Sequence, residues 1–593
     1  MPTVNLGRVK PIYKGIYSPA TAYVPLDFVS YNGVAYFCTA PTTGNAPTNA
    51  TYWQPVVDVA TWASLVAAPS KIPLADANGM LDPSWYAAFN RLRINDIGVP
   101  GQPGFGVGVC PQPPAGYTPM SGVTDVLHAN YGNYEFTDGS VMVWIPAFFV
   151  RWAHAGNPSH AAYGANSVDV KPLAAYPDDV AAEADGYHRH RAFYHAGAAQ
   201  PGFFYDKYKC SNNSGTASSL PLSMPLVSGP QAGQTGFSSL TGSPTNNLSG
   251  ALAAARTRGA EFFPATVFMR DALATLAMAH AQRATGTRAC AWYDPTGVRN
   301  FPLGCNNALR DINDTSLTFV SAGASAQPNM PLTGSASVLA KTTHNGQDCG
   351  VADVNGTVWD INVGVTTIVA SKTITAATKT NPVTLTVTAH GLATGAVVHV
   401  AGLTAGMTQI NDRLYTVSVI DADTISLDGV DGTAFSDYTT GGQVRTARFY
   451  ALTTAADMTA VTAGNSGATD LWGAAGVAAL YDEIFPASWR TDYSNNATGQ
   501  RYGNAAAQVF GWDTAAARLL TMSGFPVSGA VSPAGSNLFG QDQFFQFFVD
   551  QLCVLSGGPW GNGTYAGVRA RALNHYRTNS SNNTGFVAAS YLP

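Results

Sequence analysis

The sequence has few charged residues and no concentration of positive charge. Charged side chains make up only 11% of the 593 residues, whereas roughly a quarter is usual. Such a chain must rely on backbone hydrogen bonds and apolar packing more than on surface ion pairs. The net charge of −5 comes without any stripe of lysine and arginine. This excludes the electrostatic footprint of a nucleic-acid-binding protein.

Long apolar runs and paired cysteines are also missing. No stretch of about 18 apolar residues occurs, and no basic segment followed by an apolar run begins the chain. We therefore expect no membrane insertion and no signal peptide, as in a protein made in a host cytoplasm and released by lysis. The seven cysteines include no Cys-x-x-Cys pair, so neither a disulfide scaffold nor a zinc site is expected.

Glutamate is scarce, and this bears on catalysis. Glycoside cleavage needs two carboxylates about 5 to 9.5 Å apart, and only four glutamates are available for such a pair. The sequence also has no Gly-x-Ser-x-Gly elbow and no phosphate-binding loop. We therefore predict no catalytic residues, and the chain is predicted not to be an enzyme. The four glutamates are Glu135, Glu183, Glu261 and Glu483.

Glycine (60) and proline (36) are abundant instead, which favours β-structure with many turns. A chain of 593 residues exceeds one hydrophobic core, since a domain usually holds about 100 to 200 residues. The predicted fold class is therefore modular and mainly β with some α.

Residues 1–58 are predicted to form a small β domain. Alternating apolar and polar positions flank Asn32-Gly33, the strongest short hairpin signal. The segment resembles the small carbohydrate-binding modules of chitinases, which implies that Tyr17, Tyr23 and Trp53 stack on sugar rings. The alternative is that these aromatic residues form the core of a domain with little else to bury. Residues 59–104 are predicted to be an extended linker and trimerisation connector.

Three separated motifs, residues 130–149, 201–208 and 353–361, occur in residues 105–593, together with a closing pair, Gly557-Gly558-Pro559-Trp560 and Gly585-Phe586. They resemble the C-type-lectin fold, in the branch shared by formylglycine-generating enzymes and variable proteins. The resemblance implies an α+β lectin-like domain in two parts, residues 105–370 and 447–593. An amphipathic helix is predicted within residues 262–282 from apolar positions at i, i+3, i+4 and i+7.

Residues 371–446 interrupt this pattern with short alternating strands separated by Gly, Asp and Asn turns. They predict an inserted small β-barrel or sandwich domain. The segment resembles the small β domain inserted in ubiquitin-activating enzymes, which is also common in phage tail proteins. A spacer or an extra contact surface is its expected role.

The C-terminal stretch between Gly-Gly-Pro-Trp and Gly-Phe is rich in Tyr, Asn and Ser, residues that suit recognition surfaces. In the variable proteins of diversity-generating retroelements, which include phage tropism determinants, this stretch faces solvent. The resemblance implies that Gly557, Gly558, Gly567, Arg569 and Gly585 are scaffold. The implied receptor-binding residues are Trp560, Asn562, Thr564, Tyr565, Asn574, His575, Tyr576, Thr578 and Ser580.

The function implied by these resemblances is that of a bacteriophage tail-fibre or tail-tip receptor-binding protein, a homotrimer at the distal tail of the virion. Its partners would be a bacterial surface receptor, protein or glycan, and other phage tail and baseplate proteins. A tail-associated polysaccharide depolymerase and a bacterial lectin-like adhesin are the alternatives.

No cofactor is predicted, and structural calcium is left open. His188, His190 and His195 could suggest a shared metal site in a threefold fibre. Solvated histidines before a strand are the alternative interpretation, and no metal ligand is predicted.

Overall fold

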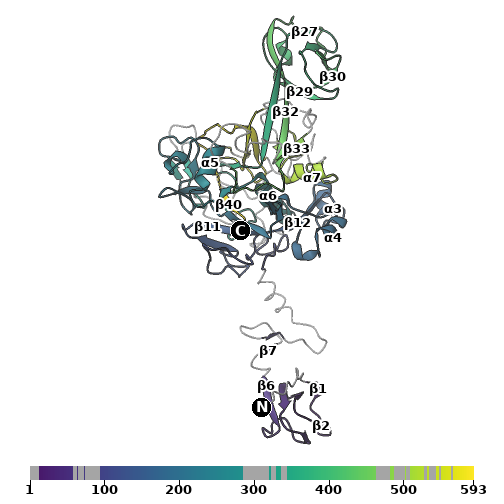
Figure 1. Ribbon diagram of the computed structural model, residues 1–593, viewed down its shortest axis with the longest axis vertical. Helices are drawn as coiled ribbons and strands as arrows, with labels where there is room; N and C mark the ends of the chain where they lie inside the picture. Colours follow the sequence, from purple (N-terminus) through teal and green to yellow (C-terminus); the bar gives the residue numbers. More distant parts are fainter. Residues whose placement is uncertain are drawn as a thin grey trace, which may run out of the picture. The chain divides into compact units, whose positions relative to one another are not determined.

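The computed structural model of the chain separates into two compact units, Met1–Leu92 and Arg93–Pro593, and each is described by itself (Figure 1). The architecture is modular and mainly β with few helices. None of the helices in the described part of the chain is long and apolar enough to cross a membrane. The structure describes residues 12–57, 63–64, 72–73, 94–284, 319–321, 329–335, 343–461, 481–485, 501–502, 508–526, 531–532, 542–546, 549–562 and 565–593.

The N-terminal unit contains a four-stranded sheet with the order β1-β3-β4-β6. The hairpin predicted at Asn32-Gly33 is confirmed, because Tyr31 pairs with Val34 and the two turn residues have φ values of 51° and 79°. The bounds are β1 Ile12–Ile16, β3 Asp27–Tyr31, β4 Val34–Cys38 and β6 Trp53–Val57, with β2 Ala22–Tyr23, β5 Thr42–Thr43, β7 Ala63–Ser64 and β8 Ile72–Pro73 as short pairs.

The larger unit is built on a sheet that unites early and late parts of its chain. The predicted apolar strand after Asp138-Gly139 and the aromatic strand at residues 201–208 are present, and they pair with each other as β11 and β17. The last strand, β40, pairs with β17. The order is β22-β40-β17-β11-β10-β9. The bounds are β9 Tyr117–Pro119, β10 Asn133–Phe136, β11 Val141–Pro146, β17 Gly202–Asp206, β22 Phe263–Pro264 and β40 Ala588–Ser590.

A second sheet brings the third sequence motif to the C-terminal stretch. Its order is β36-β38-β37-β25-β39, and a separate sheet has the order β13-β12-β14. The bounds are β25 Trp359–Asn362, β36 Phe544–Gln546, β37 Leu552–Ser556, β38 Arg571–Tyr576 and β39 Thr584–Gly585 for the second sheet, and β12 Phe148–Trp152, β13 Val168–Pro172 and β14 His188–Arg189 for the separate one.

The main helix, α6 (Val267–Arg283), lies where the apolar periodicity predicts it. It begins at the N-cap Thr266, whose hydroxyl accepts a hydrogen bond from the Met269 N–H, and every residue from Val267 to His280 is buried. An amphipathic helix would leave one face in water, but here other segments cover the remaining face. The other α-helices are α3 His160–Tyr163, α4 Asp179–Ala184, α5 Leu248–Ala255 and α7 Ala515–Met522.

The strands of the inserted domain belong to an eight-stranded sheet. Seven of its strands have the order β26-β32-β29-β30-β31-β28-β27, and the eighth, β33, pairs with β32. Strand β32 is continuous from the inserted domain into the main body (Figure 1). It pairs with β26 over nine residue pairs, from Val365–Ala451 to Thr373–Gln443. Two hydrogen-bonded strands, β26 and β32, therefore attach the inserted domain to the main body. The bounds are β26 Val365–Thr373, β27 Ala376–Thr378, β28 Thr384–Thr386, β29 Val397–Ala405, β30 Arg413–Val419, β31 Thr424–Leu427, β32 Thr440–Leu452 and β33 Tyr481–Phe485.

Buried neutral histidines hold the start of the larger unit. His344 accepts a hydrogen bond at Nδ1 from Val351 N–H, and its Nε2 lies 3.0 Å from the Gly106 carbonyl oxygen. Gly106 has φ +83°, and a Cβ there would lie 2.8 Å from His344 Nε2, so glycine is required. His280 Nδ1 accepts a hydrogen bond from Gly101 N–H. Residues 94–106, mostly assigned to the linker by sequence, thus pack on the main body.

Acidification is expected to destabilise the larger unit through His344. Burial lowers the pKa of this imidazole from 6.5 to about 4. The unfolded chain therefore binds the proton more tightly than the folded chain. The free energy of unfolding is highest above about pH 6.5 and falls by about 3 kcal/mol as the pH is lowered to about 4. Urea unfolding at several pH values measures this fall. In His344→Gln the free energy of unfolding should depend less steeply on pH. An identical slope in the variant would contradict the assignment.

Candidate functional site

The inserted domain has its own core, which follows from its alternating sequence. In Val383-Thr-Leu385-Thr-Val387 every second side chain is apolar, and these three are buried. They pack with the apolar residues of β29, β30 and β31 in one cluster separate from the main core. A sheet alternates its side chains between two faces, so the intervening polar residues remain at the surface. The alternating apolar residues of the insert thus account for a buried cluster of their own.

One surface of this domain combines an exposed apolar side chain with two acids. The turn that joins β30 to β31 places Ile420 in solvent, with 57% of its surface exposed. Asp421 and Asp423 follow it and are exposed. The Asp423 N–H donates to the Asp421 carboxylate at 2.9 Å, and this bond holds the pKa of Asp421 below its ordinary value. Asp421 is therefore charged at neutral pH.

A neighbouring loop fixes this turn. The His390 ring accepts a hydrogen bond at Nδ1 from Leu392 N–H, which leaves its Nε2 to donate to the Asp421 carbonyl oxygen at 2.8 Å. The Ala389 N–H donates to the Asp423 carboxylate at 2.6 Å. The turn is thus held in one shape by backbone and side-chain bonds. We call residues 389–395 and 420–423 the turn surface.

The predicted receptor-binding residues fall into three groups in the structure. Trp560 is only 2% exposed and packs in a small cluster with Val227, Met330 and Val358. It belongs to the core because its neighbours close over the ring. Thr564 lies outside the described residues. Asn562 and His575 are half-buried, whereas the exposed members are Tyr565, Asn574, Tyr576, Thr578 and Ser580.

The residues assigned to the scaffold are buried. Gly557 and Gly558 have φ values of +89° and +84°, a backbone region that suits glycine, and a Cβ on Gly558 would lie 2.8 Å from Ala566. Gly567 and Gly585 are buried as well. The residues assigned to the scaffold are thus buried, and Trp560 is buried with them.

The three aromatic residues of the N-terminal unit gather around one another. Tyr23 and Trp53 are each 1% exposed, with ring centroids 5.1 Å apart. Tyr17 is half-buried and stacks on Tyr23 at 5.7 Å. Two of the three residues assigned to sugar stacking therefore have no face in solvent, as the alternative of an aromatic core anticipates.

The histidines do not meet at a metal site. His190 is completely buried, and its Nε2 lies 3.1 Å from Asp271, so the interpretation of solvated histidines is wrong for this residue. His188 lies 3.5 Å from Glu183, and His195 lies 3.4 Å from Asp457. Within the described ranges no group of three or more His, Cys, Asp or Glu residues could hold a metal ion. That no cofactor binds, with structural calcium left open, stays a prediction.

The five cysteines within the described residues are free thiols and are buried. Burial raises the pKa of Cys110 and of Cys553 to about 12, and it also raises the pKa of Cys210 and Cys349. A nucleophilic thiol needs a lowered pKa and access to substrate. None of these five meets that requirement.

A buried ionic cluster behind the C-terminal stretch was not predicted from the sequence. Arg569 Nη1 lies 2.8 Å from Asp271 Oδ1, and both side chains are at most 1% exposed. Burial disfavours the charge of Asp271, but Arg569 and His190 hold its pKa below the ordinary value. The charges that interrupt the apolar run of α6 were the available signal, since a charge on a buried helix needs a partner.

The inserted domain is a small β domain with a core of its own and an exposed turn between β30 and β31. A protein-family model identifies it further: residues 379–448 match the FCCH domain of ubiquitin-activating enzyme E1. The match spans 70 of 593 residues and covers most of the segment whose pattern resembles that domain. No curated protein matches the chain.

This match overturns the functional predictions made from the resemblance to variable proteins. The prediction of a phage tail-fibre or tail-tip receptor-binding protein with a C-type-lectin-like domain is wrong on this finding, and its two alternatives are unsupported. The prediction of no enzyme is contradicted, because the matched domain belongs to an enzyme family. The misleading signals were short glycine and aromatic motifs, which serve turns and cores in many β-rich folds.

The predicted partners and location are contradicted for the same reason. The predicted bacterial receptor, phage tail and baseplate proteins and homotrimer are contradicted by this match. The predicted place at the distal tail of a virion is contradicted by the same match.

Proposed function

We propose that the inserted domain is a protein-docking module and that its partner is a ubiquitin-like protein. The observation that carries the proposal is the family match over residues 379–448. Those residues include the turn surface and the strands that hold it. The proposal concerns this domain and assigns no reaction to the rest of the chain.

The attachment of the domain supports a docking role. Nine consecutive residue pairs join β26 to β32, and β32 then pairs with β29 inside the domain. A partner bound to a module on paired strands is held in a narrower range of positions than one on a flexible linker. Such an arrangement reduces the ordering cost of binding.

The chemistry of the turn surface indicates the kind of contact. Ile420 offers an apolar centre, and the exposed Asp421 and Asp423 place negative charge beside it in the same turn. A complementary partner surface has an apolar patch with basic side chains at its edge. Charge complementarity of this kind sets orientation and association rate, while the apolar centre contributes most of the affinity.

Replacing Ile420 by Arg is expected to weaken the binding of ubiquitin to the full chain by about tenfold or more. The change removes the apolar contact and places a like charge opposite the expected basic edge. Binding to immobilised ubiquitin by surface plasmon resonance measures it. Ile420 makes no core contact that the substitution would remove, so the domain should remain folded.

Leu127→Arg is the matched control, because Leu127 is 62% exposed and belongs to the main body. This variant should bind as the unmodified chain does. Equal loss in both variants, or no binding of ubiquitin by the unmodified chain, would contradict the proposal.

A further inference from the structure

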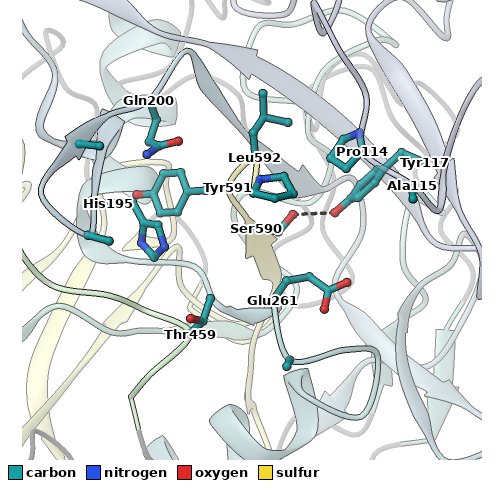
Figure 2. A pocket seen from close by; sticks show the side chains of 14 residues that line it. Pro114, Ala115, Tyr117, His195, Gln200, Glu261, Thr459, Ser590, Tyr591 and Leu592 are labelled. Carbon is teal, nitrogen blue, oxygen red and sulfur yellow. Dashed lines mark hydrogen bonds between the residues drawn. The ribbon is translucent and has the colours of Figure 1, made fainter.

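A pocket in the larger unit is formed by five segments that are far apart in the sequence (Figure 2). Its volume is about 810 Å³, within the range of roughly 300 to 1,000 Å³ that is typical of small-molecule sites. The segments are residues 114–117, 195–200, 260–261, 459 and 590–593.

Aromatic rings form two walls of the pocket, and hydrogen bonds fix both. Tyr591 stacks on His195 with ring centroids 4.6 Å apart, and its hydroxyl donates to the Ala192 carbonyl oxygen at 2.8 Å. The Tyr117 hydroxyl shares a 2.6 Å hydrogen bond with Ser590, drawn as a dashed line in Figure 2. The walls are therefore preformed, and a ligand would lose little free energy in ordering them.

The lining of the pocket is largely apolar, and it carries an acidic side chain without a basic one among the described residues. Proline, alanine and leucine side chains supply much of its lining, and neither Lys nor Arg is among the residues that the structure places there. His195 does not add positive charge at neutral pH, because burial lowers the pKa of its ring, an effect that Asp457 only partly opposes. The one acidic side chain in the lining is Glu261.

Glu261 is exposed on the side of the pocket near Tyr117 (Figure 2). Its carboxylate lies over Gly259, where a Cβ would come within 2.5 Å of Oε2. Among the described residues it has no basic partner within ion-pair distance. With no basic partner among the described residues, this carboxylate can pair with the cationic group of a ligand.

We propose that this pocket binds a small organic cation that carries a flat apolar ring. The ring would lie against the walls formed by Tyr117 and Tyr591, and the cationic group would lie near Glu261. Aromatic faces attract cations as well as apolar rings, so both parts of such a ligand have a counterpart. An anion would meet the carboxylate without a compensating base. This site is separate from the inserted domain and does not depend on its proposed function.

A series of three indoles of similar size separates charge from shape: tryptamine is a cation, indole-3-acetamide is neutral and indole-3-acetate is an anion. Isothermal titration calorimetry on the full chain should show tryptamine binding about fivefold more tightly than the amide, which is the effect of one partly exposed ion pair. The acetate should bind most weakly.

Glu261→Gln should remove the preference for tryptamine over the amide while retaining the binding of both. Glu183→Gln is the matched control, because Glu183 is an exposed acid on α4 that does not line the pocket. The thermal unfolding midpoint of each variant shows that it is folded. Binding of none of the three indoles at about 1 mM, equal binding of all three, or a preference that survives in Glu261→Gln would overturn the proposal.

Discussion

Replacing Arg569 by Met is expected to destabilise the larger unit by about 3 to 5 kcal/mol, because the substitution leaves the Asp271 carboxylate buried without its main partner. The carboxylate is 1% exposed and lies 2.8 Å from Arg569 Nη1. His190 and Thr275 also contact the carboxylate but carry no charge, since burial lowers the pKa of the His190 imidazole. The charge of Arg571 also favours the ionised carboxylate. Urea unfolding followed by tryptophan fluorescence measures the loss.

The double variant Arg569→Met with Asp271→Asn provides the control for this prediction. Removing both charges avoids the cost of one unpaired buried ion, so the double variant should be more stable than Arg569→Met alone. Arg569 also lies over the Phe510 ring at 4.4 Å, and the Met side chain preserves part of that packing. A single variant that loses less than about 1 kcal/mol would contradict the account of the cluster.

Trp560→Ala is expected to lower the stability of the larger unit by about 3 to 5 kcal/mol, the usual cost of deleting a large buried aromatic side chain. The ring is 2% exposed and fills the cluster with Val227, Met330 and Val358. If Trp560 were instead a surface contact, its replacement by Ala would change binding and leave stability unaffected. Denaturant unfolding distinguishes the two roles.

Tyr576→Ala is the matched comparison, because Tyr576 belongs to the same C-terminal stretch but is 46% exposed. Its loss should change stability by no more than about 0.5 kcal/mol. Similar effects of the two substitutions would show that the burial pattern of the stretch is not the one described.

Local sequence patterns predicted the elements well. The Asn32-Gly33 hairpin, helix α6 and the alternating strands of the inserted domain each depend on residues that are close together in the chain. Their periodicity or turn chemistry is sufficient to specify them.

Properties that arise from distant contacts could not be predicted in this way. The burial of Trp560 depends on Val227 and Met330, more than two hundred residues away. The pocket near Tyr591 brings together five separate segments. The C-terminal stretch has the composition of an exposed recognition surface, yet composition alone cannot distinguish an aromatic residue that lies on the surface from one that packs beneath it.

Hydrogen–deuterium exchange of the full chain with and without ubiquitin tests the central claim most directly, because it reports on every backbone amide without a substitution. We expect slower exchange in the turn surface, residues 389–395 and 420–423, when ubiquitin is present, and no change in the exposed segment around Leu127. Unchanged exchange throughout the inserted domain at saturating ubiquitin, or protection confined to the main body, would contradict the claim that the inserted domain docks this partner.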